Sequence, residues 1–446
     1  MIEIKDKMKT VRKHGGPLVG AACAFLVLAT GCKESYPGIQ YEESDEVTGN
    51  VESSDSLPIM LTVNAPQLSF ATRGTGAIDE ENSEWKTRQT RFYVYAFLGN
   101  NEFYNGPVDY TQHATNPQND HCLVDDPVTG HGRLVRFERT GGVTDADGAL
   151  EWADGGERVY YNYTHQDYKY DFFLYHLDDA FVSNFSRQRD EISFDVEIDG
   201  TQDIISGIAS PSASDIERLE NETNKDFLYD IRGEQNYVYS TLLAHRGVHP
   251  NFKVQHELVR FRFFIKKGDE MAGDISISDI IIHGSDKARF TVAAQDAEKV
   301  GLDFAAYPKH TRDFHLPEKN VSADGSISYT PTDATGITPE KYDLKRMNVG
   351  EMVQIGDDLL MAPQCSYMLT LRCQQKIIQN GEEVIRTFSP LYTLSLQDTP
   401  DVPLTPGSLY NVNISVYGLQ EIQIQTEGLE WKKGHDINLD DEEMTD

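Results

Sequence analysis

The chain has 446 residues and carries a formal net charge of −32 at pH 7. A surface this acidic repels nucleic acid and anionic lipid headgroups, so we expect no nucleic-acid partner. The length is more than one ordinary hydrophobic core occupies, and it predicts two domains. Cys122, Cys365 and Cys373 are the cysteines that we place in the folded part, and their spacing favours no disulfide framework.

The N-terminus determines the expected compartment. A basic stretch leads into an apolar run, Leu18–Ala29, of about twelve residues, which is shorter than the roughly 20 residues needed to cross a bilayer. We therefore predict that residues 1–31 are a secretion signal. The segment Leu28–Cys32 resembles a bacterial lipobox, after which signal peptidase II leaves an acylated cysteine. We expect Cys32 to be the lipidation site and its acyl chains to contact the lipid bilayer; an ordinary signal with an incidental cysteine is the alternative.

Residues 32–56 form a polar, acidic tract with few apolar residues to bury, which predicts a flexible acidic tether. Beyond the tether, most of the strong patterns have a period of two. Ile192–Ile198 alternates apolar and polar residues, which predicts a strand with one buried row and one row facing water. Tyr367–Cys373 and Tyr410–Val416 show the same alternation.

Other segments are apolar on both faces. Phe92–Leu98 and Tyr170–Tyr175 are typical of central strands that are covered on each side. In Phe252–Ile265 the apolar positions change parity, which predicts a β-bulge near His256 and Glu257. The helical signal is weak, and the best candidate is 214–224, where Ser214 could cap the helix.

Many short strands separated by turns predict an all-β protein built of sandwiches. We place the domain boundary in Ala244–Pro250, which gives an N-terminal β-sandwich domain over 57–246 and a C-terminal β-sandwich domain over 247–446. Two long polar stretches, 105–148 and 296–357, are predicted to be surface excursions.

The sequence offers little catalytic signal. His256–Arg260 begins like a zinc-protease motif, but Arg260 occupies the place of the second histidine, and the segment reads as strand. The donors His113, His121, Cys122 and His131 fit no tight metal site, and no phosphate loop or nucleophile elbow is present. We therefore expect no metal, no cofactor and no enzymatic activity.

One ordered set of segments carries a family resemblance. A strand-like run at Leu57–Val63 is followed by a stretch ending Ala71–Gly74, an acidic loop at Asp79–Glu81, and a strand at Arg91–Leu98. This order resembles the start of the fimbrillins, the lipoprotein-derived pilus subunits of Gram-negative gut and oral anaerobes. Later landmarks of the family are matched at Asp226–Tyr229, His256–Phe261, Leu359–Gln364, Pro406–Tyr410, and Trp431 with Gly434 and Asp436.

The resemblance implies two tandem transthyretin-like Greek-key β-sandwich domains. It also implies a maturation protease that cuts between Arg73 and Gly74, with Arg88 and Arg91 as less favoured sites. The expected location is the outer membrane and cell surface, first as a lipid-anchored precursor and then in the fimbrium after assembly.

The resemblance further suggests strand exchange. A sandwich that lacks one strand exposes an apolar groove and unpaired backbone groups, which another strand can fill by β-strand addition. Our hypothesis is that 57–70 fills the groove in the precursor, and that a terminal strand of other pilus subunits replaces it. The candidate donor is 420–440.

The long insertions favour a tip or accessory subunit over a stalk subunit. Two other functions compete with the pilus subunit. The first is a monomeric surface lipoprotein that binds a glycan or a host protein, with Trp85, Trp152 and exposed tyrosines as stacking platforms. The second is a hydrolase, which would require a convergent polar pocket.

Overall fold

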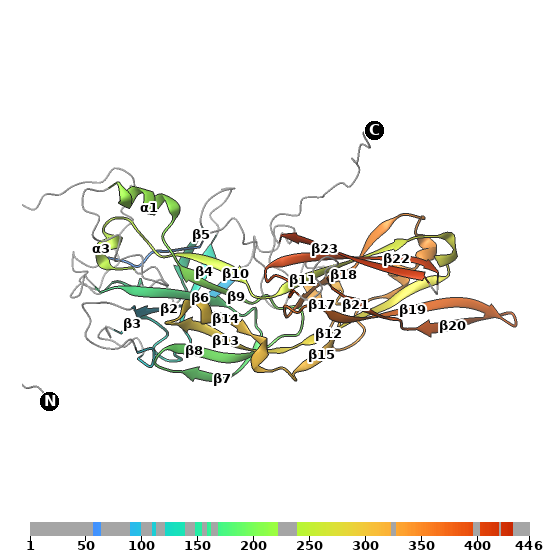
Figure 1. Cartoon of the computed structure of the whole chain (residues 1–446), viewed down its shortest axis with the longest axis horizontal. Helices are drawn as coiled ribbons and strands as arrows, with labels where there is room; N and C mark the ends of the chain where they lie inside the picture. The colour runs from blue at the N-terminus through green and yellow to red at the C-terminus, as the bar shows by residue number, and fades with distance from the viewer. Residues whose placement is uncertain are drawn as a thin grey trace, which may run out of the picture. The chain divides into compact units, whose positions relative to one another are not determined.

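The computed structural model describes these parts of the chain: 57–63, 90–99, 109–112, 121–138, 148–153, 158–161, 168–221, 239–322, 327–395, 402–418 and 421–430. Most of this structure is β-strand (Figure 1), which confirms the all-β class. The two tandem transthyretin-like Greek-key domains remain a prediction. None of the helices in these parts is both long and apolar enough to span a membrane.

Two α-helices lie in the described part, α1 (Ala213–Glu220) and α3 (Thr241–Ala244). α1 agrees with the helix predicted over 214–224, but its cap is Ser212 and not Ser214. The hydroxyl oxygen of Ser212 accepts a hydrogen bond from the backbone N–H of Asp215 at 3.1 Å, which satisfies a free donor at the helix start.

The first large sheet has the strand order β3-β2-β4-β5-β1-β10-β9-β6. Its strands are β1 (Leu61–Val63), β2 (Thr90–Leu98), β3 (Cys122–Val124), β4 (Arg133–Glu138), β5 (Gly148–Trp152), β6 (Tyr170–His176), β9 (Ile205–Ala209) and β10 (Asn251–His256). Because β2 pairs with β6 as well as with β4, the sheet closes on itself. We call it the closed sheet.

Strands β2 and β6 of the closed sheet each have one face in one hydrophobic core and the other face in a second core. On β2, the side chains of Phe92, Val94 and Leu98 lie in the core inside the closed sheet. Tyr95 and Phe97, on the opposite face, join a second core. Every one of these side chains is fully buried, which confirms the prediction of a strand covered on both faces.

A second sheet covers the outer face of β2 and β6. Its order is β14-β13-β8-β7, from β7 (Phe181–Arg187), β8 (Glu191–Glu197), β13 (Lys287–Ala294) and β14 (Gly301–Asp303). The ring centroid of Tyr175 on β6 lies 5.6 Å from that of Phe194 and 6.0 Å from that of Phe290. The apolar row predicted on β8 is therefore buried.

Among the polar residues predicted to face water on β8, Ser193 and Asp195 are buried, so the prediction was wrong for these two, whereas the side chain of Glu197 is 45% exposed. Ser193 is 1% exposed and Asp195 is fully buried. The carboxylate of Asp195 lies 2.8 Å from Nε of Arg289 and accepts a hydrogen bond from Asn184 at 2.7 Å. Paired polar side chains can occupy a covered face, because their partners offset the loss of water.

The remaining large sheets pack face to face. One has the order β18-β11-β22-β23, from β11 (Val259–Lys267), β18 (Met352–Met361), β22 (Ser408–Gly418) and β23 (Glu421–Glu430). The other has the order β15-β12-β19-β20 with β21 beside β19, from β12 (Ile275–Ser285), β15 (Thr311–His315), β19 (Tyr367–Gln379), β20 (Glu382–Phe388) and β21 (Leu391–Leu394). Short elements are β16 (Lys319–Val321), β17 (Ile327–Tyr329), and the 3-10 helices η3 (Glu270–Ala272), η4 (Ala297–Lys299), η5 (Phe304–Ala306), η6 (Pro339–Tyr342) and η7 (Leu344–Arg346).

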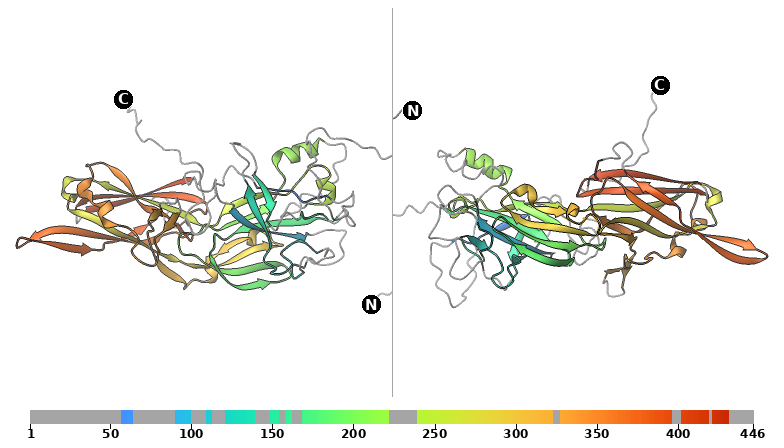
Figure 2. Two further views of the ribbon diagram at one scale, coloured as in Figure 1. Left: turned by 180° about the vertical axis from the view of Figure 1, so that it is seen from behind. Right: turned by 60° about the horizontal axis from the view of Figure 1, so that its bottom comes forward.

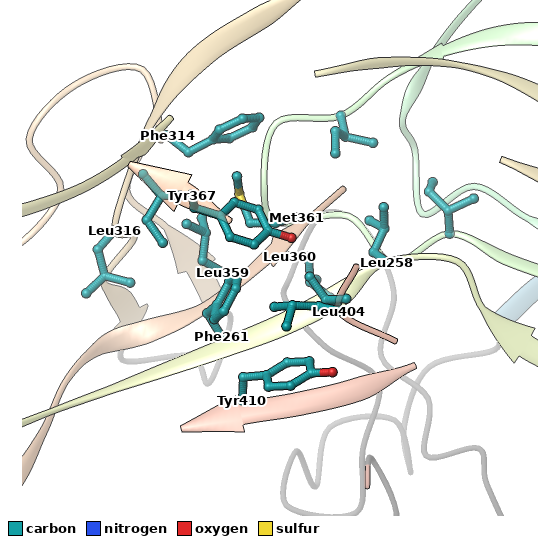
Figure 3. Close-up of a cluster of buried hydrophobic side chains, with 14 of the residues drawn as sticks. Leu258, Phe261, Phe314, Leu316, Leu359, Leu360, Met361, Tyr367, Leu404 and Tyr410 are labelled. Carbon is teal, nitrogen blue, oxygen red and sulfur yellow. The ribbon is translucent and has the colours of Figure 1, made fainter. Parts of the chain in front are cut away.

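Figure 3 shows part of the core between these two sheets, where the ring of Tyr367 lies over Phe261. Their centroids are 5.0 Å apart and their planes nearly perpendicular, as aromatic pairs prefer. The alternation predicted on 367–373 and 410–416 is confirmed. Its apolar side chains are at most 4% exposed.

The bulge predicted near His256 and Glu257 was wrong. β10 ends at His256 in the closed sheet, and β11 begins at Val259 in a different sheet. The apolar parity changes because the chain leaves one sheet and enters another, with the fully buried Leu258 between them.

The two long insertions do not lie wholly on the surface. In 105–148, Val124 is 1% exposed and Val135 fully buried; in 296–357, Phe314, Leu316 and Leu344 are fully buried. The polar composition of these stretches gave no sign of their isolated core positions.

Strands from both sides of residue 246 share sheets, since β10 pairs with β9 and β13 pairs with β8. The division into domains at that residue stays a prediction.

Asp171 on β6 gives a prediction about pH. The side chain is 6% exposed, and its Oδ1 has no hydrogen-bond partner in the described part of the chain. Burial raises the pKa of the Asp171 carboxyl to about 7, against about 3.9 in an unfolded chain. The folded state thus holds the proton more tightly. The contribution of the Asp171 carboxyl to stability is complete below about pH 4 and is lost as the pH rises through about 7.

Asp171→Asn stays neutral at every pH. We expect it to be more stable than the wild type above pH 7, by roughly 1–4 kcal/mol, and to lose this advantage towards pH 4. Urea unfolding between pH 4 and pH 8 measures the difference. Asp333→Asn, at an exposed position, is the matched control and should change stability by less than about 0.5 kcal/mol throughout. A pH-independent difference for Asp171→Asn would contradict the prediction.

Candidate functional site

β1, the first strand in the described part of the chain, lies between two other strands of the closed sheet. β1 runs antiparallel to β5, with Leu61 opposite Leu150 and Val63 opposite Gly148. On its other side it runs parallel to β10, with Val63 opposite Phe252. β1 is therefore an inserted strand, although it has only three residues.

The residues before β1 extend the pairing. The carbonyl oxygen of Leu57 accepts a hydrogen bond from the backbone N–H of Tyr161 at 3.0 Å, and the N–H of Ile59 donates to the carbonyl of Val159 at 2.7 Å. On the β10 side, the N–H of Thr62 donates to the carbonyl of Pro250 at 3.0 Å. Leu57–Val63 thus behaves as one extended segment.

Alternate side chains of this segment enter the core inside the closed sheet. Ile59, Leu61 and Val63 are 2%, 3% and 0% exposed, whereas Met60 is 42% exposed. Burying an aliphatic side chain of this size contributes about 1.5–3 kcal/mol. The three side chains together stabilise the protein by roughly 5–9 kcal/mol, an amount comparable to the whole stability of a typical domain.

Removing the segment would leave a specific defect. β5 and β10 would each lose a pairing partner, and the core would open where Ile59, Leu61 and Val63 had been. A groove of this kind, with unpaired backbone groups along an apolar floor, is what an incoming β-strand can fill. To restore the same pairing, that strand must run parallel to β10.

Several residues singled out in the sequence lie outside the described residues, namely Cys32, Arg73, Gly74, Trp85 and Arg88. Arg91 is described and lies on β2, opposite Arg136 on β4. Its carbonyl oxygen is 2.7 Å from Nδ1 of His176. A cut at Arg91 would sever a central strand, so the structure disfavours it as a cleavage site.

The candidate donor region begins with β23. This strand pairs antiparallel with β22 and lies at the edge of its sheet. Ile422 and Ile424 are partly buried against the core, in keeping with the alternation in the sequence. In this structure β23 pairs with its own chain, and residues 431–446 lie outside the described part.

The segment that begins like a zinc-protease motif holds the chain where it passes between sheets. His256 Nδ1 lies 3.0 Å from a carboxylate oxygen of Asp203, and Arg260 pairs with the buried carboxylate of Asp358. Glu257 accepts a hydrogen bond from the backbone N–H of Leu302 at 3.1 Å. Burial raises the pKa of Glu257, and the hydrogen bonds that its carboxylate accepts from Ser206, Leu302 and Gln255 oppose that rise. No group of three or more His, Cys, Asp or Glu side chains suited to a metal occurs among the described residues.

Trp152, proposed as a stacking platform, has a structural contact instead. Its indole Nε1 donates a hydrogen bond to the carbonyl of Ile59 at 3.3 Å, and the guanidinium of Arg133 lies 5.5 Å from the ring centroid. The ring is half-buried beside the β1 segment. It therefore helps to hold that segment in place, a role that the sequence pattern did not indicate.

Comparison with known proteins yields structural neighbours alone. No family model and no curated protein matches the chain. Solved structures similar to it include that of a proposed cell adhesion protein from Bacteroides uniformis. The two chains are 10% identical, the TM-score is 0.38, and the match covers 85% of this chain and 100% of that one. A protein named for cell adhesion from Bacteroides ovatus is 12% identical, with a TM-score of 0.37 and coverage of 84% and 98%.

The fimbrial anchor protein Mfa2 from Porphyromonas gingivalis is 10% identical to this chain, with a TM-score of 0.29 and coverage of 84% and 98%. These neighbours are of the kind that a resemblance to fimbrillins predicts. At such low identities and TM-scores, the likeness carries no argument about what this chain does.

The burial pattern of the β1 segment predicts the cost of truncating it. Leu61→Ala and Val63→Ala should each lower the free energy of unfolding, by about 2–5 kcal/mol for the leucine and somewhat less for the valine, because each leaves a cavity in the core. Met60→Ala, on the exposed face of the same segment, should change it by less than about 1 kcal/mol. Equal effects at positions 60 and 61 in chemical unfolding would show that β1 is not seated in the core.

Proposed function

We propose that this chain is a cell-surface fimbrial subunit that assembles by strand exchange after proteolytic release of its first strand. One observation carries the proposal. The Leu57–Val63 segment is inserted between β5 and β10, fills an apolar core with three side chains, and is held by short ladders. A replaceable strand needs all three properties.

The proposed sequence of events begins at the membrane. The precursor is held in the outer membrane by acyl chains on Cys32 and is cut by a protease between Arg73 and Gly74. Both residues of the cut follow β1 and precede β2, which begins at Thr90. Cleavage there detaches the segment covalently from the rest of the sheet, and only pairing and packing then retain it.

The energetics favour replacement over simple release. Exposing the three buried side chains would cost roughly 5–9 kcal/mol, so an empty groove would be a poorly stable state. An incoming strand that makes the same contacts, and extends beyond three residues of regular pairing, offsets this cost. The proposed donor is 420–440 of another subunit, which would separate from β22 to become available.

The position in the filament is proposed from chain length. Besides its buried strand residues, the stretch 296–357 carries many exposed residues; a densely stacked stalk would have to accommodate them, and this favours a tip or accessory subunit. The competing function, a monomeric surface lipoprotein that binds a glycan or a host protein, would use exposed aromatic platforms. Trp152 is engaged with Ile59 and Arg133, which removes one of the platforms proposed for it.

N-terminal sequencing of assembled material tests the cleavage step. We expect polymers to begin at Gly74, and unboiled samples to form a ladder on denaturing gels. Arg73→Gln should abolish both the new N-terminus and the ladder, whereas Arg88→Gln should leave both unchanged. Polymers that begin at Cys32 would rule out the cleavage step.

A reversible lock tests the exchange itself. Thr62 on β1 lies opposite Ala149 on β5, and antiparallel partners are about 4.5–5.5 Å apart at Cα, within reach of a disulfide. Thr62→Cys combined with Ala149→Cys should allow cleavage after Arg73 but block polymer growth until a reductant is added. Thr62→Cys alone should polymerise with or without reductant. Growth of the oxidised double variant would show that β1 does not leave.

A further inference from the structure

The hairpin formed by β19 and β20 extends past the core of its sheet (Figures 1 and 2). Cys373 on β19 is fully buried, but no side chain from Gln374 to Thr387 is. Asn380 and Gly381 form its tight turn, with φ of 57° and 86°, as a two-residue hairpin turn requires. An isolated two-stranded hairpin is only marginally stable in water, so this end would gain from a further strand.

β20 presents a regular and open edge. It pairs with β19 on one side with no register shift, and within the described residues it has no strand on the other side. The edge strand β7 differs, because a register shift between Ser183 and Ser186 and a positive φ of 51° at Asn184 interrupt its edge. Irregularities of that kind protect natural edges from pairing with other chains. β20 lacks them.

Large apolar side chains lie on this exposed ribbon. Ile378 is 82% exposed and Ile385 is 55% exposed. Both lie on the same face, because Ile378 is opposite Glu383 and Ile385 is opposite Lys376 in the hairpin register. A further strand beside β20 would cover part of this face.

The charges on β20 match those of a second β20. We infer that two copies of this chain pair through β20 in antiparallel register, with Val384 opposite the partner's Val384. This register places Glu382 opposite the partner's Arg386, and two-fold symmetry repeats the ion pair at the other end. A shift by two residues in one direction sets Glu383 opposite the partner's Glu383, and a shift in the other direction pairs no opposite charges. The charge pattern therefore selects both the partner and the register.

The β20 contact is separate from the proposed strand exchange. It uses a different sheet from β1, and a symmetric contact closes after two copies, whereas strand exchange is head-to-tail and continues. The contact should therefore form in the uncleaved chain, and it can succeed or fail independently of the proposed function.

Sedimentation of the uncleaved full chain over a concentration series tests the contact. We expect a dimer whose dissociation constant rises about tenfold or more in Glu382→Arg and in Arg386→Glu, because each variant sets like charges opposite at two positions. The double variant with both changes should restore the dimer to within about threefold of the wild type. A monomeric wild type, unaffected single variants, or a double variant that stays weak would each overturn the inference.

A crosslinking experiment tests the register. Val384→Cys should form a disulfide-linked dimer under mild oxidation, because antiparallel partners lie within disulfide range. Thr387→Cys, exposed on the same strand, is not opposite itself in this register and should give at least about tenfold less product. Wild type measures the background from the native cysteines. Adding Arg73→Gln to the Val384→Cys variant should leave the yield of crosslinked dimer unchanged, which separates this contact from polymer growth. Equal products from positions 384 and 387 would overturn the register.

Discussion

The closure of the first sheet depends on one interaction, the insertion of β1 between β5 and β10. β1 supplies three residues of regular pairing and, with Ile59, three of the side chains that fill the interior. The closed sheet in turn presents the outer face of β2 and β6 to the second sheet, where Tyr175 meets Phe194 and Phe290. A strand this short can hold so much structure because it is paired on both edges and because its packing, rather than its ladder, contributes most of the stability.

The second constraint is the passage from β10 to β11. Three polar groups in this passage are satisfied by residues far away in the sequence: His256 by Asp203, Glu257 by Leu302, and Arg260 by Asp358. Nearby, the N–H of Leu360 donates to the carbonyl of Gly200 at 2.8 Å. Gly200 has φ of +92°, and a Cβ there would lie 2.8 Å from Leu359, so glycine is required. Buried pairs of this kind fix the direction of the chain, because breaking one leaves a charge buried without its partner.

These constraints give the proposed function a physical form. Strand exchange needs a segment whose loss is costly and whose replacement is equivalent, and a deeply packed segment with short ladders meets both conditions. β11 also has a parallel partner, β22, from near the C-terminus, just as β10 has β1 from near the N-terminus. Both terminal regions thus add strands to sheets built from the middle of the chain.

The sequence by itself determined the all-β class, the strand at 92–98 that is buried on both faces, and the alternating strands at 367–373 and 410–416. These follow from local patterns, a continuous apolar run in the first strand and an apolar residue at every second position in the others. It could not reveal that Asp195 is buried, since its partner Arg289 is 94 positions away. Nor could it separate a bulge from a change of sheet at 256–259, because both alter parity in the same way. The sequence marked 57–63 as a strand. Only the tertiary structure decided that this strand is inserted between β5 and β10, since pairing partners are set by long-range packing that no local pattern encodes.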